Sequence, residues 1–266
     1  MITINNERTQ LFRFDENTKK IFVVGDLHGD VETFKSAIRL WKKRKNAFLI
    51  LLGDYADRGE NGFEILESLK ELTQNNRVVA LKGNHEDYSD SGEPKFSPST
   101  LIAELANKKV GWNDYFQNEL KPLLNRLYIS ALFPGIALFV HGGISNSIID
   151  KSDLAQPSLK QIDDIIWSDP TEKLGEYPNK RGRGVEFGPD VTKNILNRLD
   201  IKYIIRSHQP NLAKHAIHSS HNGSVITVSS TRWNGYTPIV VEINRKKGFC
   251  TLKTWILNNS DFVLQG

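Results

Sequence analysis

Residues 20–81 alternate between short β-branched runs and amphipathic segments with helical spacing. The runs at 20–24, 48–52 and 77–81 are typical of buried strands. Between them, Asp30 can cap a helix whose apolar residues recur three and four positions apart, and Asn61 opens a second helix with Glu64 placed to return a capping bond. Strand, helix, strand, helix, strand predicts parallel strands joined by right-handed crossovers.

The rest of the chain predicts a loop, a helical region and further strands. Residues 87–98 are polar and rich in Gly and Pro, and 101–127 has a helical pattern in which Pro122 starts a new turn. Asn222-Gly223 indicates a hairpin turn. Strands are expected at 138–140, 203–206, 224–229, 239–243 and 249–257. With no repeat or linker in the sequence, we expect a single catalytic domain over 1–266, of α/β class.

The amino-acid composition limits the cellular compartment and the classes of partner that we expect. A net charge of +4 is mild, and the cluster Lys42-Lys43-Arg44-Lys45 reads as a solvated helix end, with a patch for an acidic partner as the alternative. Cys250 is the only cysteine, which favours a reducing compartment. The first eight residues do not resemble a signal peptide, and the apolar run 47–52 is too short to span a bilayer. We therefore expect a soluble, cytoplasmic protein that binds neither membrane nor nucleic acid.

Potential metal ligands follow five of the expected strands. The segments are 25–29 (Gly-Asp-Leu-His-Gly), 53–59 (Gly-Asp-Tyr-Ala-Asp-Arg-Gly), 83–86 (Gly-Asn-His-Glu), 141–143 (His-Gly-Gly) and 207–208 (Ser-His). Because open α/β sheets bind ligands beyond the carboxyl ends of their strands, we expect these groups to meet at one sheet edge. Carboxylate, imidazole and amide donors without thiolate suit hard or borderline divalent metals.

This set of motifs resembles the calcineurin-like metallophosphoesterases, and within them the phosphoprotein phosphatase (PPP) family. Trp167-Ser168-Asp169-Pro170, the Arg-Gly-Val segment at 183–185 and Arg206-Ser207-His208-Gln209 carry the narrower likeness, which covers roughly residues 20 to 243. The resemblance implies a layered β-sandwich of mixed sheets flanked by helices. It also implies a protein serine/threonine phosphatase in which a hydroxide bridging two metals attacks phosphorus in line.

The resemblance also implies a role for each site residue. The cofactors would be two divalent ions, with Mn favoured and Fe or Zn as alternatives. His85 would be the general acid, oriented by Asp57, and the phosphate would be held by Arg58, Arg183 and Asn84. The metal ligands would be Asp26 and His28 on one ion, Asn84, His141 and His208 on the other, and Asp54 bridging both.

Several features leave alternatives open. Ser229 to Asn234 departs from the family's Ser-Ala-Pro-Asn-Tyr-Cys stretch and puts Trp233 in the tyrosine's place over the substrate. The residues Asp87, Asp90 and Glu93 read as a solvated loop, or else as groups shaping access to His85. The histidines His215, His218 and His221 read as solvated hairpin residues.

Two other functions share these motifs. The alternative within hydrolases is a dinucleoside polyphosphate hydrolase, and the alternative of another class is a scaffold that kept the fold and lost catalysis. Phosphoserine and phosphothreonine proteins are the expected substrates, and the sequence does not determine the oligomeric state.

Overall fold

The computed structural model describes residues 9–246, 249–257 and 262–265. The N-terminal residues 1–8, on which the expected lack of a signal peptide rests, lie outside these ranges. No helix within the described ranges has both the length and the apolar character needed to cross a bilayer.

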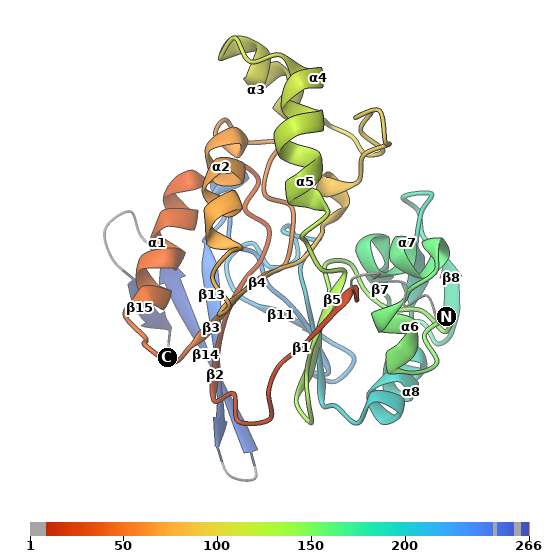
Figure 1. The fold of residues 1–266 in the computed structure, drawn as a ribbon. Coiled ribbons are helices and arrows are strands. Elements are labelled where there is room, and N and C mark those ends of the chain that lie inside the picture. Colours follow the sequence, from red (N-terminus) through yellow and green to blue (C-terminus); the bar gives the residue numbers. More distant parts are fainter. Residues whose placement is uncertain (1–8, 247–248, 258–261, 266) are drawn as a thin grey trace, which may run out of the picture.

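Two six-stranded sheets pack face to face, with helices on their outer faces (Figure 1). The first sheet has the order β15-β14-β13-β2-β3-β4 and the second β1-β5-β6-β10-β12-β11. The strands of the first sheet are β2 (Lys20–Val24), β3 (Phe48–Leu51), β4 (Val78–Ala80), β13 (Ile239–Lys246), β14 (Phe249–Leu257) and β15 (Phe262–Gln265). Those of the second are β1 (Leu11–Arg13), β5 (Ser130–Phe133), β6 (Ala137–Phe139), β10 (Tyr203–Arg206), β11 (His218–Ser220) and β12 (Val225–Thr227).

The helices and a small third sheet complete the fold. In Figure 1 the helices that follow β2 and β3 lie on one side of the sandwich and those between β6 and β10 lie on the other. The third sheet consists of β7 (Asp169–Pro170), β8 (Glu176–Pro178) and β9 (Val185–Phe187). The helices are α1 (Val31–Lys42), α2 (Gly62–Leu72), α3 (Leu101–Asn107), α4 (Trp112–Tyr115), α5 (Lys121–Leu124), α6 (Lys151–Ala155), α7 (Leu159–Trp167) and α8 (Pro189–Leu199).

Strand β2 shows why the sequence forms a sandwich. Ile21 and Val23 point into the apolar cluster between the two sheets, while Phe22 and Val24 point into the cluster beneath the helices. A strand buried on both faces needs a continuous apolar run, and its parallel pairing with β3 confirms the predicted crossover. The predicted α/β fold and layered mixed sheets are confirmed.

Asn61 opens α2 as predicted, but the capping box expected with Glu64 is wrong. Asn61 precedes α2 but makes no side-chain capping bond; instead Glu104 of α3 accepts the amide of Phe63 at 3.1 Å. Glu64 does not return a cap either, because it pairs with Lys35 of α1 at 2.7 Å. A side chain from a neighbouring helix thus replaces the local capping box that the sequence suggested.

The turn at Asn222-Gly223 is a hairpin turn, but it joins strands that the sequence analysis did not pair. It links β11 to β12, which are antiparallel, whereas the predicted strand β10 runs parallel to β12. Strand β11 escaped notice because its three residues, His218 to Ser220, carry no β-branched or apolar signal.

Candidate metal centre

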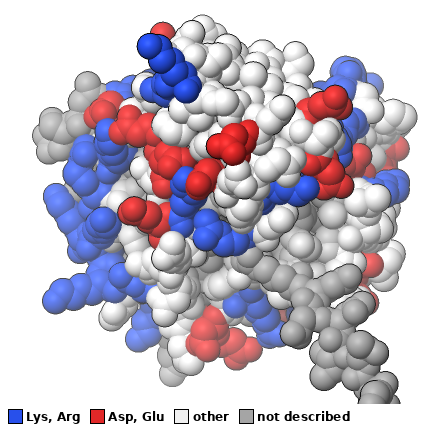
Figure 2. Space-filling view, turned by 45° about the horizontal axis from the view of Figure 1, so that its top comes forward, with Lys and Arg blue, Asp and Glu red and all other residues white. Residues whose placement is uncertain are grey.

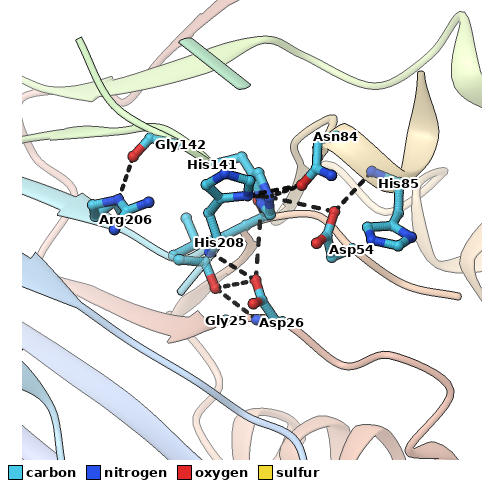
Figure 3. Close-up of polar contacts among 12 residues, drawn as sticks. Gly25, Asp26, Asp54, Asn84, His85, His141, Gly142, Arg206 and His208 are labelled. Carbon is cyan, nitrogen blue, oxygen red and sulfur yellow. Dashed lines mark hydrogen bonds and ion pairs between the residues drawn. The ribbon is translucent and has the colours of Figure 1, made fainter. Parts of the chain in front are cut away.

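Five loops from two different sheets meet at one end of the sandwich (Figure 3). The loops after β2, β3 and β4 belong to the first sheet, and those after β6 and β10 belong to the second. The expectation of a single sheet edge is therefore wrong, although the strands do end together. The side chains brought together are Asp26, His28, Asp54, Asn84, His85, His141 and His208, and all are buried.

Asp54 is shared by two groups of potential metal ligands. In the first group, His28 and His85 lie with Asp54 so that one donor atom of each falls within 4.8 Å of the others. In the second group, His141 and His208 do the same. Asp26, which the resemblance placed beside His28, has its Oδ2 atom 3.9 Å from His28 Nε2.

Hydrogen bonds to backbone carbonyl oxygens orient the imidazole rings of His28 and His141 toward the two ligand groups. His28 Nδ1 lies 3.2 Å from the Ala56 carbonyl oxygen, and His141 Nδ1 lies 2.8 Å from that of Leu52. A carbonyl can only accept, so each Nδ1 carries a proton and each Nε2 faces the centre. His141 Nε2 then lies 3.0 Å from Asn84 Oδ1 and 3.3 Å from Asp54 Oδ1.

Four buried polar atoms at the centre lack a hydrogen-bond partner among the described residues. Buried polar atoms are nearly always bonded, so this concentration needs an explanation. Oxygen and nitrogen donors gathered in one place fit divalent metal ions, and no sulfur takes part. The atoms are Asp26 Oδ2, His28 Nε2, Asp54 Oδ2 and His85 Nε2. His208 turns its Nδ1 toward the centre, 2.8 Å from Asn84 Oδ1, while its Nε2 lies 3.9 Å from Asp169 Oδ1.

The pKa values of His28 and His208 suit ligation, whereas that of His141 is raised by its carboxylate neighbour. Burial lowers the pKa of His28 to about 4 and that of His208 well below its usual value, so both rings are neutral near pH 7. Burial would also lower the pKa of His141, but Asp54 outweighs burial and raises it to about 8. Burial likewise disfavours the Asp54 carboxylate, yet His141 and His85 hold its pKa well below the ordinary value. The centre therefore presents a carboxylate between imidazoles.

His85 and Asp57 form a buried pair beside the first group. His85 Nδ1 lies 3.0 Å from Asp57 Oδ2, and the other Asp57 oxygen accepts the amides of Thr100 and Leu101 at the start of α3. Burial would lower the pKa of His85, but the charge of Asp54 and the bond from Asp57 raise it. The ring is thus held rigidly, with a proton on Nδ1 and Nε2 directed at the centre.

The two arginines expected to bind phosphate have different surroundings. The Arg58 guanidinium lies 5.2 Å over the Trp233 ring, and its buried Nε has no acceptor among the described residues. Arg183 lies 4.9 Å over the Trp167 ring and also bonds Asp163 and, at 2.8 Å, Asp87. Asp87 is 6% exposed, so its assignment to a solvated loop is wrong; besides Arg183, Lys82 and Lys95 each lie 3.7 Å from its carboxylate.

Glu86, the last residue of the Gly-Asn-His-Glu motif, has a structural role that the motif alone did not indicate. Its carboxylate accepts the amides of Asp54, Tyr55 and Gly83 at 2.8–3.0 Å and so fixes the loop that carries Asp54. Burial and the Asp54 charge raise its pKa to about 7.

Ser207 and His221 also differ from their sequence-based assignments. Ser207 was only part of a motif, but its hydroxyl donates to Asp26 Oδ1. His221, expected to be solvated, is buried, and its Nδ1 lies 2.7 Å from the Thr192 hydroxyl.

Comparison with known proteins places this centre in context. The family model described as calcineurin-like phosphoesterase matches residues 19–212. A rat serine/threonine-protein phosphatase with EF-hands 1 is 32% identical over 260 residues, covering 80% of this chain and 39% of that protein. The Drosophila melanogaster serine/threonine-protein phosphatase rdgC is 30% identical, with coverage of 80% and 35%. The chain therefore spans less than half the length of these two relatives.

Solved structures share the fold. A Saccharomyces cerevisiae protein serine/threonine phosphatase superposes with a TM-score of 0.72 at 24% identity, covering 93% of this chain and 84% of that one. A cold-active protein tyrosine phosphatase superposes with a TM-score of 0.66 at 17% identity, covering 96% and 80%. The same fold thus occurs in proteins named for different phosphorylated residues.

Proposed function

Because this chain belongs to the calcineurin-like phosphoesterase family, we propose that it is a metal-dependent phosphatase for phosphoserine and phosphothreonine in proteins. Its relatives named as serine/threonine-protein phosphatases support the substrate class. We propose two divalent ions as cofactors, with Mn favoured over Fe or Zn, held by Asp26, His28, Asp54, Asn84, His141 and His208. When bound, such ions lower the pKa of water and neutralise charge on a phosphoryl group.

The observation that carries the proposal is the His85–Asp57 pair beside the shared Asp54. A serine or threonine alkoxide is a strongly basic leaving group, so it needs a proton as the phosphorus–oxygen bond breaks. Asp57 holds His85 Nδ1 at 3.0 Å, and the neighbouring carboxylates raise the pKa of the ring. His85 is therefore suited to hold a proton on Nε2 and deliver it to the leaving oxygen.

We propose that Arg58 binds the phosphate and that Arg183 assists it. Arg58 offers a guanidinium with no ion pair among the described residues, so an incoming anion need not displace a carboxylate. Arg183 already bonds Asp87 and Asp163, which leaves fewer of its N–H groups for substrate. Asn84 lies between His141 and His208 and is placed to contact the same anion.

A substrate panel tests the proposal. The purified chain with Mn²⁺ is assayed on matched phosphoserine, phosphothreonine and phosphotyrosine peptides and on diadenosine tetraphosphate. We expect higher kcat/KM on the first two peptides than on the others. Preference for the dinucleotide would assign the chain to polyphosphate hydrolysis, and preference for phosphotyrosine would overturn the substrate class. Inactivity on all four would favour a scaffold.

A further inference from the structure

A groove lies away from the metal centre, between α1 and α2. Its volume is about 540 Å³, which is within the usual range for ligand sites. Its floor is apolar and contains Ile38 and Leu72 above the buried rings of Phe34 and Trp41. We call it the α1–α2 groove.

The rim of the α1–α2 groove is basic. Lys35, Arg39, Lys42 and Arg77 line it, and Glu71 is its one acidic lining residue. Figure 2 shows Lys and Arg side chains gathered on the left of the molecule, the side on which α1 lies in Figure 1. Lys35 is paired with Glu64 at 2.7 Å and with Glu32 at 3.7 Å, so the positive charge of the rim comes mainly from Arg39, Lys42 and Arg77.

The rim is partly preorganised. Arg77 lies 5.2 Å over the Trp41 ring and donates to the Lys45 carbonyl oxygen, and Arg39 donates to the Ser36 hydroxyl at 2.7 Å. Lys42 lies in the last turn of α1 and has no ion-pair partner among the described residues. Compensation of the helix dipole accounts for a cation at that turn, but not for an apolar groove beside it.

We propose that the α1–α2 groove binds an extended acidic peptide segment of a protein partner, with an apolar side chain on the floor. Charge complementarity selects the acidic residues, and burial of the anchor supplies most of the affinity. A nucleic acid fits less well, because the floor rings of Trp41 and Phe34 are 1% and 3% exposed and cannot stack on bases. The proposal does not depend on the phosphatase assignment.

The groove is separate from the metal centre. Helix α1 begins three residues after His28 and has twelve residues, so about 18 Å separates its two ends. The groove runs along α1 from Phe34 to Lys42 and does not include the turn that follows His28. Charge reversal there should leave hydrolysis of a small aryl phosphate unchanged, which separates peptide binding from catalysis.

Fluorescence polarisation with a defined peptide tests the proposal. The probe is a fluorescein-labelled ten-residue peptide with Leu at its centre and Glu and Asp at the flanking positions. The comparison peptides replace Leu with Ala, or all acidic residues with Lys. We expect saturable binding of the acidic Leu peptide to the full chain, weaker binding of the Ala peptide and none of the Lys peptide.

Two matched double variants locate the binding site. Arg39→Glu/Lys42→Glu reverses two charges on the rim, and Lys193→Glu/Lys202→Glu reverses two exposed lysines on and just after α8. We expect about tenfold weaker binding for the first variant, equal to about 1.4 kcal/mol, and less than about a threefold change for the second. Ile38→Ala should weaken binding of the Leu peptide more than that of the Ala peptide. The melting temperature of each variant verifies folding.

Several outcomes would overturn the proposal. Equal weakening by both double variants would show only a long-range effect of net charge. If no binding were detected at millimolar peptide, the proposal would be wrong, and the basic rim would be no more than the solvated end of α1. Tighter binding of a single-stranded oligonucleotide, lost in Arg39→Glu/Lys42→Glu, would assign the groove to nucleic acid instead.

Discussion

At the scale of single residues, the sequence located the ligands but not their surroundings. Asp54, His85 and His141 were named because each follows a strand and carries a donor that divalent metals accept. The burial of Asp87 could not be predicted, because its shortest ion pair is with Arg183, which lies 96 positions away in a loop with no strand or helix signal. Contacts of this kind depend on how distant segments pack together, which the spacing of residues along the chain does not reveal.

Replacement of His85 by Asn tests its role as the acid. Asn keeps polarity but cannot hold an exchangeable proton of suitable pKa, so kcat on a phosphoserine peptide should fall by about 100- to 10,000-fold. An aryl phosphate, whose leaving group needs less protonation, should lose less. His215→Asn changes an exposed histidine and is the matched control. Equal losses on both substrates would indicate that His85 only positions other groups.

The contact between Arg58 and Trp233 gives a second prediction at this scale. An indole face under a guanidinium stabilises it by about 0.5–2 kcal/mol, so Trp233→Leu should raise KM and the inhibition constant of phosphate by about 2- to 30-fold with little change in kcat. Trp233→Phe should restore most of the affinity. Tyr236→Leu removes a ring that contacts Trp233 edge-on and serves as the control.

A double-mutant cycle makes the coupling measurable. If Trp233 acts through Arg58, the losses caused by Trp233→Leu and Arg58→Ala should not add. Additive losses would show that Trp233 contacts the substrate independently of Arg58.

At the scale of elements, Asp30 connects α1 to the loop that carries Trp233. Its side chain accepts the Thr33 amide at 3.0 Å as the predicted N-cap, and it also bonds the Arg232 guanidinium at 2.8 Å. The sequence predicted the cap, which is local, but not the ion pair, whose residues are 202 positions apart. One carboxylate thus starts a helix and holds a distant loop.

Asp30→Asn separates these two roles, because Asn is as good a cap as Asp but carries no charge. Loss of the charge-assisted bond to Arg232 should lower the free energy of unfolding by about 1–2 kcal/mol at pH 7. Asp150→Asn, at the N-cap of the exposed helix α6, should change stability less. Urea unfolding measures both, and an equal loss in the two variants would mean that the Arg232 bond contributes nothing.

The same pair predicts a pH dependence. Burial would raise the pKa of Asp30, but the bonds from Arg232 and Thr33 outweigh burial and lower it below the ordinary 3.8. The stabilisation is therefore complete above pH 3.8 and is lost as the pH falls through the lower folded-state pKa. The stability difference between the natural chain and Asp30→Asn should shrink on acidification. If this stability difference grew on acidification, the pKa of Asp30 would be raised in the folded state and the prediction would be wrong.

At the scale of the whole molecule, the centre joins the two halves of the sandwich. Asp26, Asp54 and Asn84 follow strands of the first sheet, and His141 and His208 follow strands of the second. The periodicity of residues 20–81 was sufficient to predict half of this arrangement. The pairing of two sheets was not predictable in the same way, because β1 and β5 are short and pair across more than a hundred residues.

Metal removal should therefore affect both activity and stability. Chelation is expected to abolish hydrolysis and lower the melting temperature, and Mn²⁺ should restore both. An ion at a hundred times its dissociation constant adds about 2.7 kcal/mol to the stability of the folded state. Asp54→Asn removes the shared ligand and should abolish the Mn²⁺-dependent rise in melting temperature. Full activity in a verified metal-free preparation would contradict the metal-dependent mechanism.

Five residues of the metal centre have a backbone conformation that lowers the stability of the folded protein. His28, Asp54, Asp57, Arg58 and His208 all have φ between 45° and 70°, a region that suits glycine and disfavours residues with a Cβ atom. Each such residue costs on the order of 1 kcal/mol relative to a relaxed backbone. Random substitutions selected only for heat resistance should therefore enrich glycine or asparagine at Arg58, which is neither a metal ligand nor a buried hydrogen-bond acceptor, and produce inactive survivors. Heat resistance and turnover are opposed most directly at Arg58, whose side chain holds no metal and whose Nε has no acceptor among the described residues.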